Sequence, residues 1–357
     1  MAEIPTTSDT TAQVGDLTAR GPLWRVASPY FNAQTVQWID KTISPDTYRF
    51  ERVQAVGGER DWHSRRSARS SMREWRNYFE QAAHAFDSPS DGVIGVFPQL
   101  AASLAIVSRL RRDDRPIVSW FFNTTLDNEA RRRAAAIGLS RIDRFVVHTT
   151  CEIEAYSELL RIPQDRFHFA PLQYGAKVET EMPGVNEPYV FATGSGYRDY
   201  GTFFAAMQRL GYKTLVLAGP RALDGLTPPS NVEIIDHMSK EEIRRHVRHA
   251  RVNAIPLTDG GLAGGLVTIV ESFRHGRGVV STDRPGVEDY LIDGQTALLA
   301  RLGDADSLAE RIEAVWNDQT LSDKLDTNAL EFGELHCTDA AAANSLVEVL
   351  DGLGVNQ

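Results

Sequence analysis

The sequence predicts an α/β protein built from two Rossmann-like domains that face each other across a cleft. Short apolar runs alternate with amphipathic segments along most of the 357 residues, which is typical of βαβ units and a parallel sheet. The alternation stops at a stretch rich in charge, glycine and proline, residues 175–188, and then starts again. That stretch indicates a linker, and a ligand site is expected in the cleft between two such units.

The first domain is expected at residues 21–178, where apolar runs of strand length are separated by segments of helical character. The expected strands are residues 24–31, 48–56, 92–97, 116–122, 144–148 and 167–171. The expected helices are residues 32–42, 100–111, 128–137 and 152–160. Residues 1–20 are small, polar and rich in threonine, so we expect a disordered tail there.

The second domain is expected at residues 179–357, where the alternation starts again. Its expected strands are residues 189–193, 214–217, 232–235, 253–256 and 278–281. The chain then closes on helices at residues 307–316 and 340–350, and the last helix is expected to return to the first domain. This arrangement is weakly specific for function, because kinases, dehydrogenases and binding proteins share it.

Composition and charge argue against several classes of protein. The chain has 38 Lys and Arg against 48 Asp and Glu, and a net charge of −10 is unlike that of a general nucleic-acid-binding protein. No apolar run is long enough to span a bilayer and nothing near Met1 resembles a targeting signal, so we expect a cytoplasmic protein. Cys151 and Cys337 lack the spacing of metal ligands, and neither a disulfide framework nor a metal site is expected.

A glycine-rich turn at residues 260–265 is the most informative stretch of the sequence, because it leads into a short helix. Glycines let backbone N–H groups approach a ligand closely, and the start of a helix adds partial positive charge, which together favour a phosphate or diphosphate. Glu271 lies about one turn into the helix, where it can reach hydroxyls of the same ligand. The residues predicted to bind are Gly264, Gly265, Leu266, Val267, Thr268 and Glu271.

The turn and the segments that follow it, residues 278–283 and 285–299, resemble the C-terminal donor domain of the GT-B glycosyltransferases, in particular the large retaining family 4. Members of that family carry a Glu-x7-Glu element there. Glu271 matches the second glutamate, which in the family holds the ribose hydroxyls of the nucleotide. The first glutamate usually holds a hydroxyl of the donor sugar, and its position falls on Ala263, with Asp259 close enough to supply a displaced carboxylate.

The loop after the first strand of the second domain corresponds to the family's diphosphate-binding loop. The resemblance implies that Arg198 takes the place of the family's lysine and binds the diphosphate together with backbone amides of Gly194 and Gly196. Ser195 stands where the family usually has a second cation. The alternative is an ordinary connection between a strand and a helix, in which the glycines only make the turn.

Asp236 and His237 precede a capping box formed by Ser239 and Glu242. In the family, the residues just before that cap line the nucleobase pocket, so the resemblance implicates both side chains in base binding. A solvated turn residue is the alternative for His237.

A helix expected over residues 61–86 presents an apolar face and a basic face. The residues expected in its buried stripe are Ala68, Met72, Trp75, Phe79, Ala82 and Phe86. The residues on the basic face are Arg66, Arg69, Arg73 and Arg76. Such a face could dock an anionic lipid headgroup, a lipid-linked phosphate or an acidic saccharide, and a solvated basic surface is the alternative.

The family has a histidine near the reacting sugar, at the end of a segment that residues 91–99 resemble. No histidine is present in that segment. His148 lies at the end of an expected parallel strand and is a candidate, but we interpret it as a buried residue of the core or one that supports the site.

The resemblance implies a GT-B fold and a hexosyltransferase that moves a sugar, with retention, from a nucleotide-diphosphate donor to a saccharide or lipid-linked acceptor. Cell-surface glycan or glycolipid synthesis at the inner face of the membrane is the implied setting, and UDP is favoured over GDP. Arg198 and Glu271 would carry the catalytic load without a metal or other cofactor. The alternatives are an epimerase or phosphorylase of the same fold, and a degenerate scaffold that binds a partner, which Ala263 and Ser195 favour.

Overall fold

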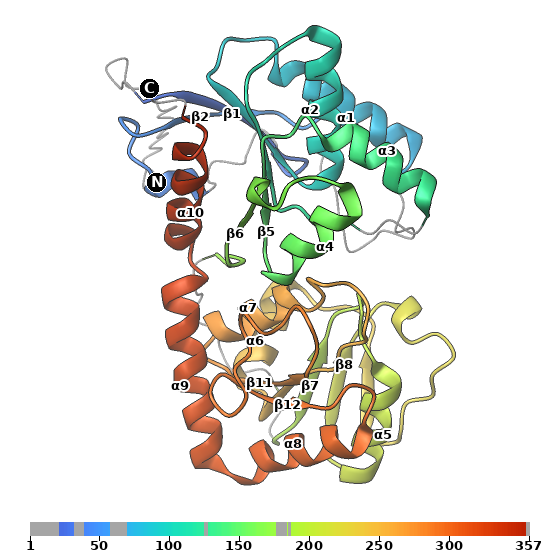
Figure 1. Cartoon of the computed structure of the whole chain (residues 1–357). Coiled ribbons are helices and arrows are strands. Elements are labelled where there is room, and N and C mark those ends of the chain that lie inside the picture. Colours follow the sequence, from blue (N-terminus) through green and yellow to red (C-terminus); the bar gives the residue numbers. More distant parts are fainter. Residues whose placement is uncertain are drawn as a thin grey trace, which may run out of the picture.

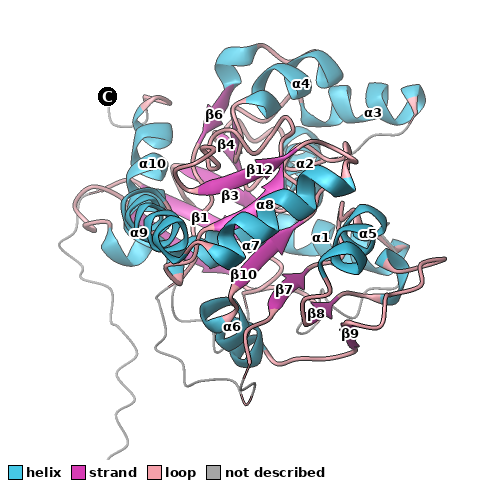
Figure 2. Cartoon of the chain, turned by 90° about the horizontal axis from the view of Figure 1, so that it is seen from below, coloured by secondary structure: helices cyan, strands magenta, loops and turns pink. Residues whose placement is uncertain are grey.

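The computed structural model describes residues 21–31, 39–57, 70–124, 128–175, 184 and 187–354. Each half of the chain forms a parallel six-stranded sheet (Figure 1). Helices lie against both sheets (Figure 2). The prediction of two Rossmann-like α/β units is therefore confirmed.

The first sheet has the strand order β2-β1-β3-β4-β5-β6. Its strands are β1 Leu23–Ala27, β2 Arg49–Val53, β3 Gly92–Val96, β4 Ile117–Trp120, β5 Arg144–Val147 and β6 Phe167–Phe169. All residues of β3 and β4 are buried, as expected for strands covered on both faces. The order changes direction beside β1, which pairs with both β2 and β3.

The second sheet has the order β12-β11-β10-β7-β8-β9. Its strands are β7 Val190–Thr193, β8 Thr214–Leu217, β9 Val232–Ile235, β10 Val252–Ile255, β11 Val279–Thr282 and β12 Ala297–Ala300. The order reverses between β7 and β10, which are neighbours. Ligands of open α/β sheets bind at the carboxyl ends of the strands at such a reversal, so a ligand is expected at the carboxyl ends of β7 and β10.

The first half contributes α1 Met72–Ala85, α2 Pro98–Arg111, α3 Glu129–Leu139 and α4 Cys151–Leu160. The second half contributes α5 Tyr200–Leu210, α6 Lys240–His249, α7 Leu266–Arg274, α8 Ala305–Asn317, α9 Gln319–His336 and α10 Asp339–Asp351. Short 3-10 turns occur at Ile39–Thr42, Gln164–Arg166 and Pro220–Ala222. Among the described helices, none combines the length and hydropathy needed to cross a membrane.

The last two helices run along both halves of the molecule (Figure 1). Helix α9 packs on α7, where Phe332 contacts Phe273 with ring centroids 5.7 Å apart. Helix α10 instead buries Leu346 and Leu350 in the core of the first sheet, and Tyr48 donates a hydrogen bond to Asp351 over 2.6 Å. The exact domain boundary stays a prediction, because residues 176–183 lie outside the described part.

The helix expected over residues 61–86 begins at Met72 in the structure, where Ser71 and Glu74 form a capping box. Residues 61–69, and with them Ala68, lie outside the described residues. Met72 is 86% exposed, so its place in the buried stripe is wrong. As the first residue after the cap, Met72 projects beyond the core, whereas Tyr78 and Ala82 are buried against it.

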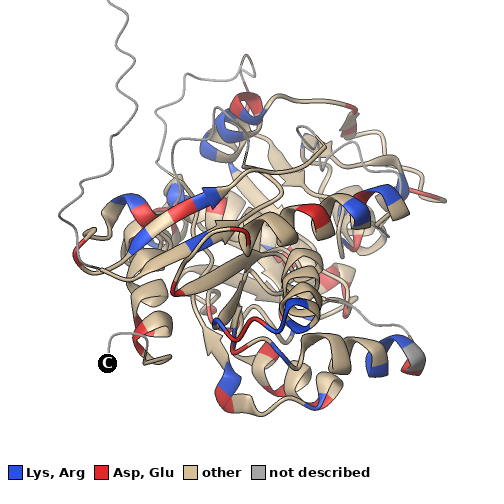
Figure 3. Cartoon of the chain, turned by 90° about the horizontal axis from the view of Figure 1, so that it is seen from above, with Lys and Arg blue, Asp and Glu red and all other residues tan. Residues whose placement is uncertain are grey.

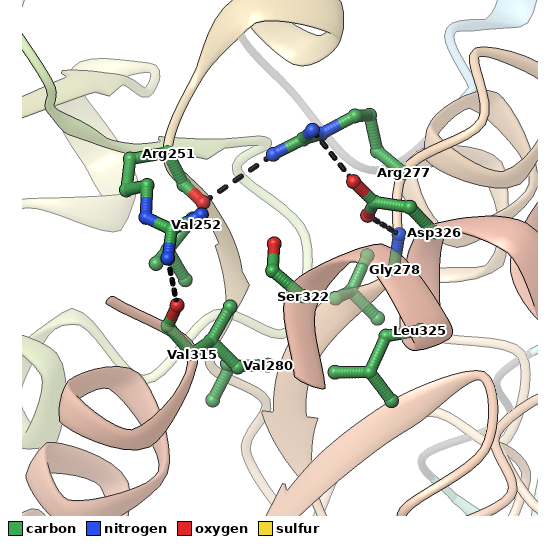
Figure 4. Close-up of a pocket in the computed structure, with 10 residues that line it drawn as sticks. Arg251, Val252, Arg277, Gly278, Val280, Val315, Ser322, Leu325 and Asp326 are labelled. Carbon is green, nitrogen blue, oxygen red and sulfur yellow. Dashed lines mark hydrogen bonds and ion pairs between the residues drawn. The ribbon is translucent and has the colours of Figure 1, made fainter. Parts of the chain in front are cut away.

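A small hollow in the second half lies at the amino ends of β10 and β11, away from the strand ends where a ligand is expected (Figure 4). Arg277 pairs with Asp326 of α9 over 2.6 Å, and the same carboxylate accepts the N–H of Gly278 over 2.8 Å. Arg251 donates to the carbonyl of Val315 over 2.7 Å. These contacts attach α8 and α9 to the sheet, and the hollow leaves no space for a water molecule.

Candidate active site

The glycine-rich turn follows β10, and α7 begins directly after it at Leu266. Gly265 precedes the helix with φ +90°, and a Cβ at this position would come within 2.9 Å of Leu257. Gly261 has φ +67°, so the turn depends on glycine at both positions. The first N–H groups of α7, which have no partner within the helix, therefore lie beside the carboxyl end of β10.

Arg284 holds the turn in place and was not predicted as a site residue. Its guanidinium donates to the carbonyls of Gly260 over 3.2 Å and Gly261 over 2.8 Å. Arg284 therefore fixes two carbonyls of the turn, and the N–H of Gly264 donates to the Gly261 carbonyl over 2.8 Å. Burial lowers the pKa of Arg284. The available signal in the sequence was its position, three residues after an expected strand and between the two segments that carry the resemblance.

Arg198 lies in the loop after β7 and reaches across to α7. It donates to the carbonyl of Thr193 over 3.1 Å, to that of Gly196 over 2.9 Å and to the hydroxyl of Thr268 over 2.9 Å. Gly194 has φ +108°, and a Cβ there would come within 2.5 Å of the guanidinium. The structure therefore brings together Gly194, Arg198 and Thr268, which the sequence placed in one site.

The electrostatics of Arg198 favour an anion. Desolvation lowers the pKa of its guanidinium, and no carboxylate in the described part of the chain forms an ion pair with it. A partly buried cation whose partners are only carbonyls and a hydroxyl is incompletely compensated. A diphosphate beside it would supply the missing negative charge.

Glu271 lies three residues after Thr268 and so on the same side of α7. Its side chain is 12% exposed and accepts a hydrogen bond from the hydroxyl of Tyr174. Arg244 of α6 donates to that hydroxyl over 3.2 Å and lies 4.0 Å from the carboxylate. Burial raises the pKa of Glu271 above the usual range, although both neighbours favour its charged form. Tyr174 and Arg244 were not predicted, because only the tertiary fold brings them to α7.

Tyr197 packs over the turn with its side chain 42% exposed, and its φ of 56° is unusual for a residue with a side chain. A Cβ on Gly261 would collide with the Tyr197 ring. Ser195, which replaces the family's second cation, accepts the N–H of Gly219 over 2.7 Å. Its hydroxyl thus connects the loops after β7 and β8, and Ser195 and Gly196 are exposed.

Asp236 and His237 follow β9 and are exposed. Strand β8 separates β9 from β7, so both residues lie toward the edge of the sheet. Within the described residues they form no hydrogen bond or ion pair with Arg198 or Glu271. They share the carboxyl end of the sheet with those residues, as a nucleobase pocket farther along the ligand would require. The Ser239–Glu242 capping box after them is confirmed.

The predicted basic face is described only in part. Arg73 and Arg76 are exposed on α1, whereas Arg66 and Arg69 lie outside the described residues. Figure 3 shows Lys and Arg interspersed with Asp and Glu over the face seen from above. The basic face therefore stays a prediction, because only two of its four arginines are described.

His148 is buried at the end of β5, as the sequence interpretation expected. Its Nδ1 lies 2.7 Å from the carbonyl of Ala170, and burial lowers the pKa of the imidazole to about 4. His148 is therefore neutral at ordinary pH. Within the described part of the chain, no group of three or more His, Cys, Asp or Glu side chains could hold a metal ion.

The two halves meet beside the glycine-rich turn. The hydroxyl of Tyr290, after β11, donates to the carbonyl of His148 over 2.6 Å and accepts the N–H of Leu172 over 2.9 Å. The hydroxyl of Thr150 donates to Asp289 over 2.9 Å. These contacts join the carboxyl end of the first sheet to the segment that follows the second-sheet strand β11.

Comparison with known proteins agrees with this geometry. Residues 188–318 match the family model of glycosyl transferases group 1, and this range covers the second sheet. The structure is similar to HepE from Anabaena in complex with UDP and glucose, with a TM-score of 0.67 and 12% identity over 93% of this chain and 100% of that one. Among curated proteins, no sequence matches this chain.

Two further solved structures have the same architecture. Sucrose-phosphate synthase from Thermosynechococcus elongatus has a TM-score of 0.68 and 14% identity, over 95% of this chain and 100% of that one. The trehalose-6-phosphate synthase OtsA has a TM-score of 0.59 and 10% identity, over 79% of this chain and 78% of that one. The two sheets and the turn at the strand reversal thus define a protein of the GT-B class.

The second half of the chain carries the group 1 glycosyl transferase domain. Residues 188–318 thus match the group 1 glycosyl transferases, and the GT-B fold covers both halves of the chain.

Proposed function

We propose that this glycosyltransferase moves a hexose from a UDP-sugar to a saccharide or lipid-linked acceptor, in the synthesis of a cell-surface glycan or glycolipid. The observation that carries the proposal is Arg198, a partly buried cation without a carboxylate partner in the described chain, beside the start of α7. UDP is favoured as the nucleotide because HepE has been solved with UDP and with UDP-glucose.

In this proposal the diphosphate of the donor binds between Arg198 and the first N–H groups of α7. Negative charge grows on the diphosphate as its bond to the sugar breaks. A fixed cation and aligned amides therefore stabilise the transition state more than the bound donor. These roles require no metal ligand, and retention of the anomeric configuration is proposed from the resemblance to family 4.

Glu271 is proposed to hold the ribose, since a carboxylate can accept hydrogen bonds from two neighbouring hydroxyls. The Tyr174 hydroxyl occupies one carboxylate oxygen in the structure, and it would share or release that oxygen when the nucleotide binds. Asp236 and His237 would then lie toward the base.

The setting proposed for the reaction is the cytoplasmic face of a membrane. Arg73 and Arg76 are exposed on α1 and, with Arg66 and Arg69, would approach an anionic headgroup or a lipid-linked phosphate. Contact of α1 with a membrane would position the acceptor and does not depend on the residues proposed to bind the donor.

The proposal is tested by measuring nucleotide release. The full chain is incubated with a panel of UDP-sugars and the matching GDP-sugars, with and without cell extract as a source of acceptors, and products are identified by mass spectrometry. We expect release of UDP that rises when extract is present, with a product heavier than its acceptor by one hexose residue. Release of GDP alone would contradict the choice of nucleotide.

A degenerate scaffold that binds a partner without transferring sugar is the second candidate. Ser195 and Ala263 favour it, because a family cation and a family carboxylate are absent at these positions. Binding of UDP in calorimetry without turnover of any UDP-sugar, with or without extract, would support the scaffold and contradict the transferase.

A further inference from the structure

Four aromatic side chains form a continuous row in the first half of the chain. We define the aromatic row as Tyr30, Phe97, Phe121 and His148. The ring centroids of successive members are 5.5, 5.0 and 4.5 Å apart, and each pair is tilted or edge-to-face. Such geometry is favourable for aromatic pairs, so the members support one another.

The row lies along one end of the first sheet. Phe97, Phe121 and His148 directly follow β3, β4 and β5, and Tyr30 lies three residues after β1. These strands are neighbours in the order β1-β3-β4-β5. The row therefore crosses the carboxyl end of the sheet, which is where open α/β sheets bind ligands.

Two members of the row have unusual backbone conformations. Phe97 has φ +74° and Phe121 has φ +61°, although both carry bulky side chains that disfavour positive φ. The structure around them maintains these conformations, since the N–H of Phe97 donates to Trp120 over 3.0 Å. Strained residues cluster at ligand sites, and here the strain falls on neighbouring strand ends.

The aromatic row continues into the donor half of the molecule. Phe121 packs both with the core of the first sheet and with the apolar cluster that contains Leu257 and Leu266. These two leucines flank the glycine-rich turn. A molecule lying on the row would consequently border the place proposed for the sugar diphosphate.

The geometry points to the accessible edge of the aromatic row, formed by the exposed Tyr30 with the half-buried Phe97 and Phe121, as the binding surface for an uncharged pyranose ring of the acceptor. This inference rests on the proposed function and names the chemistry that its acceptor must offer. A pyranose has C–H groups on one face and hydroxyls around its rim. Aromatic faces are negative and attract polarised C–H groups, while the rim stays available for reaction with the donor.

Burial and charge favour a single sugar ring over a lipid chain or an acidic group. Tyr30 is 43% exposed, whereas Phe97 and Phe121 are half-buried and His148 is buried. A lipid chain needs a wide apolar patch, on the order of several hundred Å², and the row offers little more than one exposed ring. Its histidine is neutral, because burial lowers the pKa to about 4, so no cation in the row attracts an anion.

The test uses saturation-transfer NMR on the full chain with UDP present. The probes are the methyl pyranosides of glucose, galactose and mannose, with acyclic sorbitol and octyl glucoside for comparison. We expect transfer to the ring C–H protons of at least one methyl pyranoside. Tyr30→Leu and Phe121→Leu should each weaken that transfer about fivefold. Phe79→Leu, which removes a partly buried ring of α1 away from the row, should leave it unchanged.

Three outcomes would overturn the inference. These are pyranoside signals no stronger than those of sorbitol, equal signals in wild type and both row variants, and transfer confined to the octyl chain, which would indicate a lipid surface. UDP titration of each variant verifies that it folds and keeps its donor site. If the wild type binds no UDP, the proposed function is contradicted. The pyranoside signals are a separate measurement and decide the inference about the aromatic row.

Discussion

Arg198 donates a hydrogen bond to the hydroxyl of Thr268 over 2.9 Å, and this contact joins the loop after β7 to the first turn of α7. The two elements are adjacent because β7 and β10 are neighbours at the reversal of strand order. A guanidinium held at this point lies beside the helix start that a diphosphate would approach. The contact thus links the topology of the sheet to the proposed chemistry.

Replacing Arg198 should reduce turnover more than donor binding. The charge that it would neutralise grows in the transition state, so Arg198→Ala is expected to lower kcat about 10²-fold with a smaller change in KM. The measurement is UDP release at saturating donor. Arg209→Ala, which removes an exposed arginine paired with Asp306 on α5 and α8, is the control. Wild-type kcat in Arg198→Ala would assign the role to another residue.

Two glycines of the same loop should respond differently to alanine. A Cβ at Gly194 would come within 2.5 Å of the Arg198 guanidinium, at a φ of +108°, so Gly194→Ala should displace Arg198 and reduce UDP release. A Cβ at Gly196 meets nothing within 4 Å, and Gly196→Ala should retain activity. Equal activity of the two variants would show that the position of Arg198 is unimportant.

Glu271→Ala should weaken UDP binding by about 1.5–3 kcal/mol, because it removes a charged acceptor of ribose hydroxyls. Isothermal titration calorimetry with UDP measures the effect. Glu310→Ala, an exposed carboxylate of α8, serves as the control. Unchanged affinity in Glu271→Ala would exclude the ribose role.

Glu271 should also reduce stability at neutral pH. Burial raises its pKa in the folded state, so the folded protein holds the proton more tightly than the unfolded chain, and ionisation costs stability. Glu271→Gln should therefore raise the free energy of unfolding at neutral pH. The gain should vanish as the pH falls below the ordinary carboxyl pKa, where both states are protonated. The measurement is urea titration of wild type and Glu271→Gln across this pH range. If the pKa of Glu271 were the same in the folded and unfolded states, the two proteins would differ in unfolding free energy by the same amount at every pH.

Tyr290→Phe should destabilise the junction of the two halves. Its hydroxyl is the partner of both the His148 carbonyl and the Leu172 N–H, and buried groups left without partners cost about 1–3 kcal/mol. Thermal unfolding measures the loss. Tyr212→Phe is the matched control, because the Tyr212 hydroxyl makes no hydrogen bond within the described residues, while its ring stacks on Trp316.

The predicted basic face should bind anionic membranes. Each arginine near a charged surface contributes about 1 kcal/mol, and salt screens this attraction beyond about 10 Å. In vesicle co-sedimentation with phosphatidylserine, we expect binding at low salt that fades as salt rises. It should weaken when four residues become Gln: Arg66, Arg69, Arg73 and Arg76.

A variant with the same change in charge at other exposed positions of the first half is the control for that experiment. Its substitutions to Gln are at Arg111, Arg112, Arg132 and Arg161. Equal recovery of wild type and the basic-face variant on vesicles, or no binding at all, would identify the face as a solvated surface.

Local signals in the sequence were sufficient for much of the fold. The start of α7 at Leu266 could be predicted because glycines and an apolar helical pattern are neighbours in the chain. Helix α9 was not predicted, since its buried face combines Leu325 with the small residues Ser322, Ala329 and Gly333. Such a face has weak periodicity, and only the packing against α7 reveals it.

Parts of the candidate site could not be predicted, because they depend on contacts between residues that are far apart in the sequence. Arg284 supports the turn through carbonyl groups, and Tyr174 reaches Glu271 from a segment 97 residues away in sequence. Neither contact leaves a spacing pattern. The expectation of one continuous helix over residues 61–86 was wrong, because Ser71 is extended and forms the capping box at which α1 begins.

Helix α10 belongs to the first half by packing and to the second by sequence, so the chain passes between the halves twice. The two passages touch, because the N–H of Tyr174 donates to the carbonyl of Cys337 over 3.0 Å. We expect two passages joined in this way to favour rotation of the halves about this point. Tyr174 lies at this point and also contacts Glu271, so we expect a ribose bound at Glu271 to change the angle between the halves.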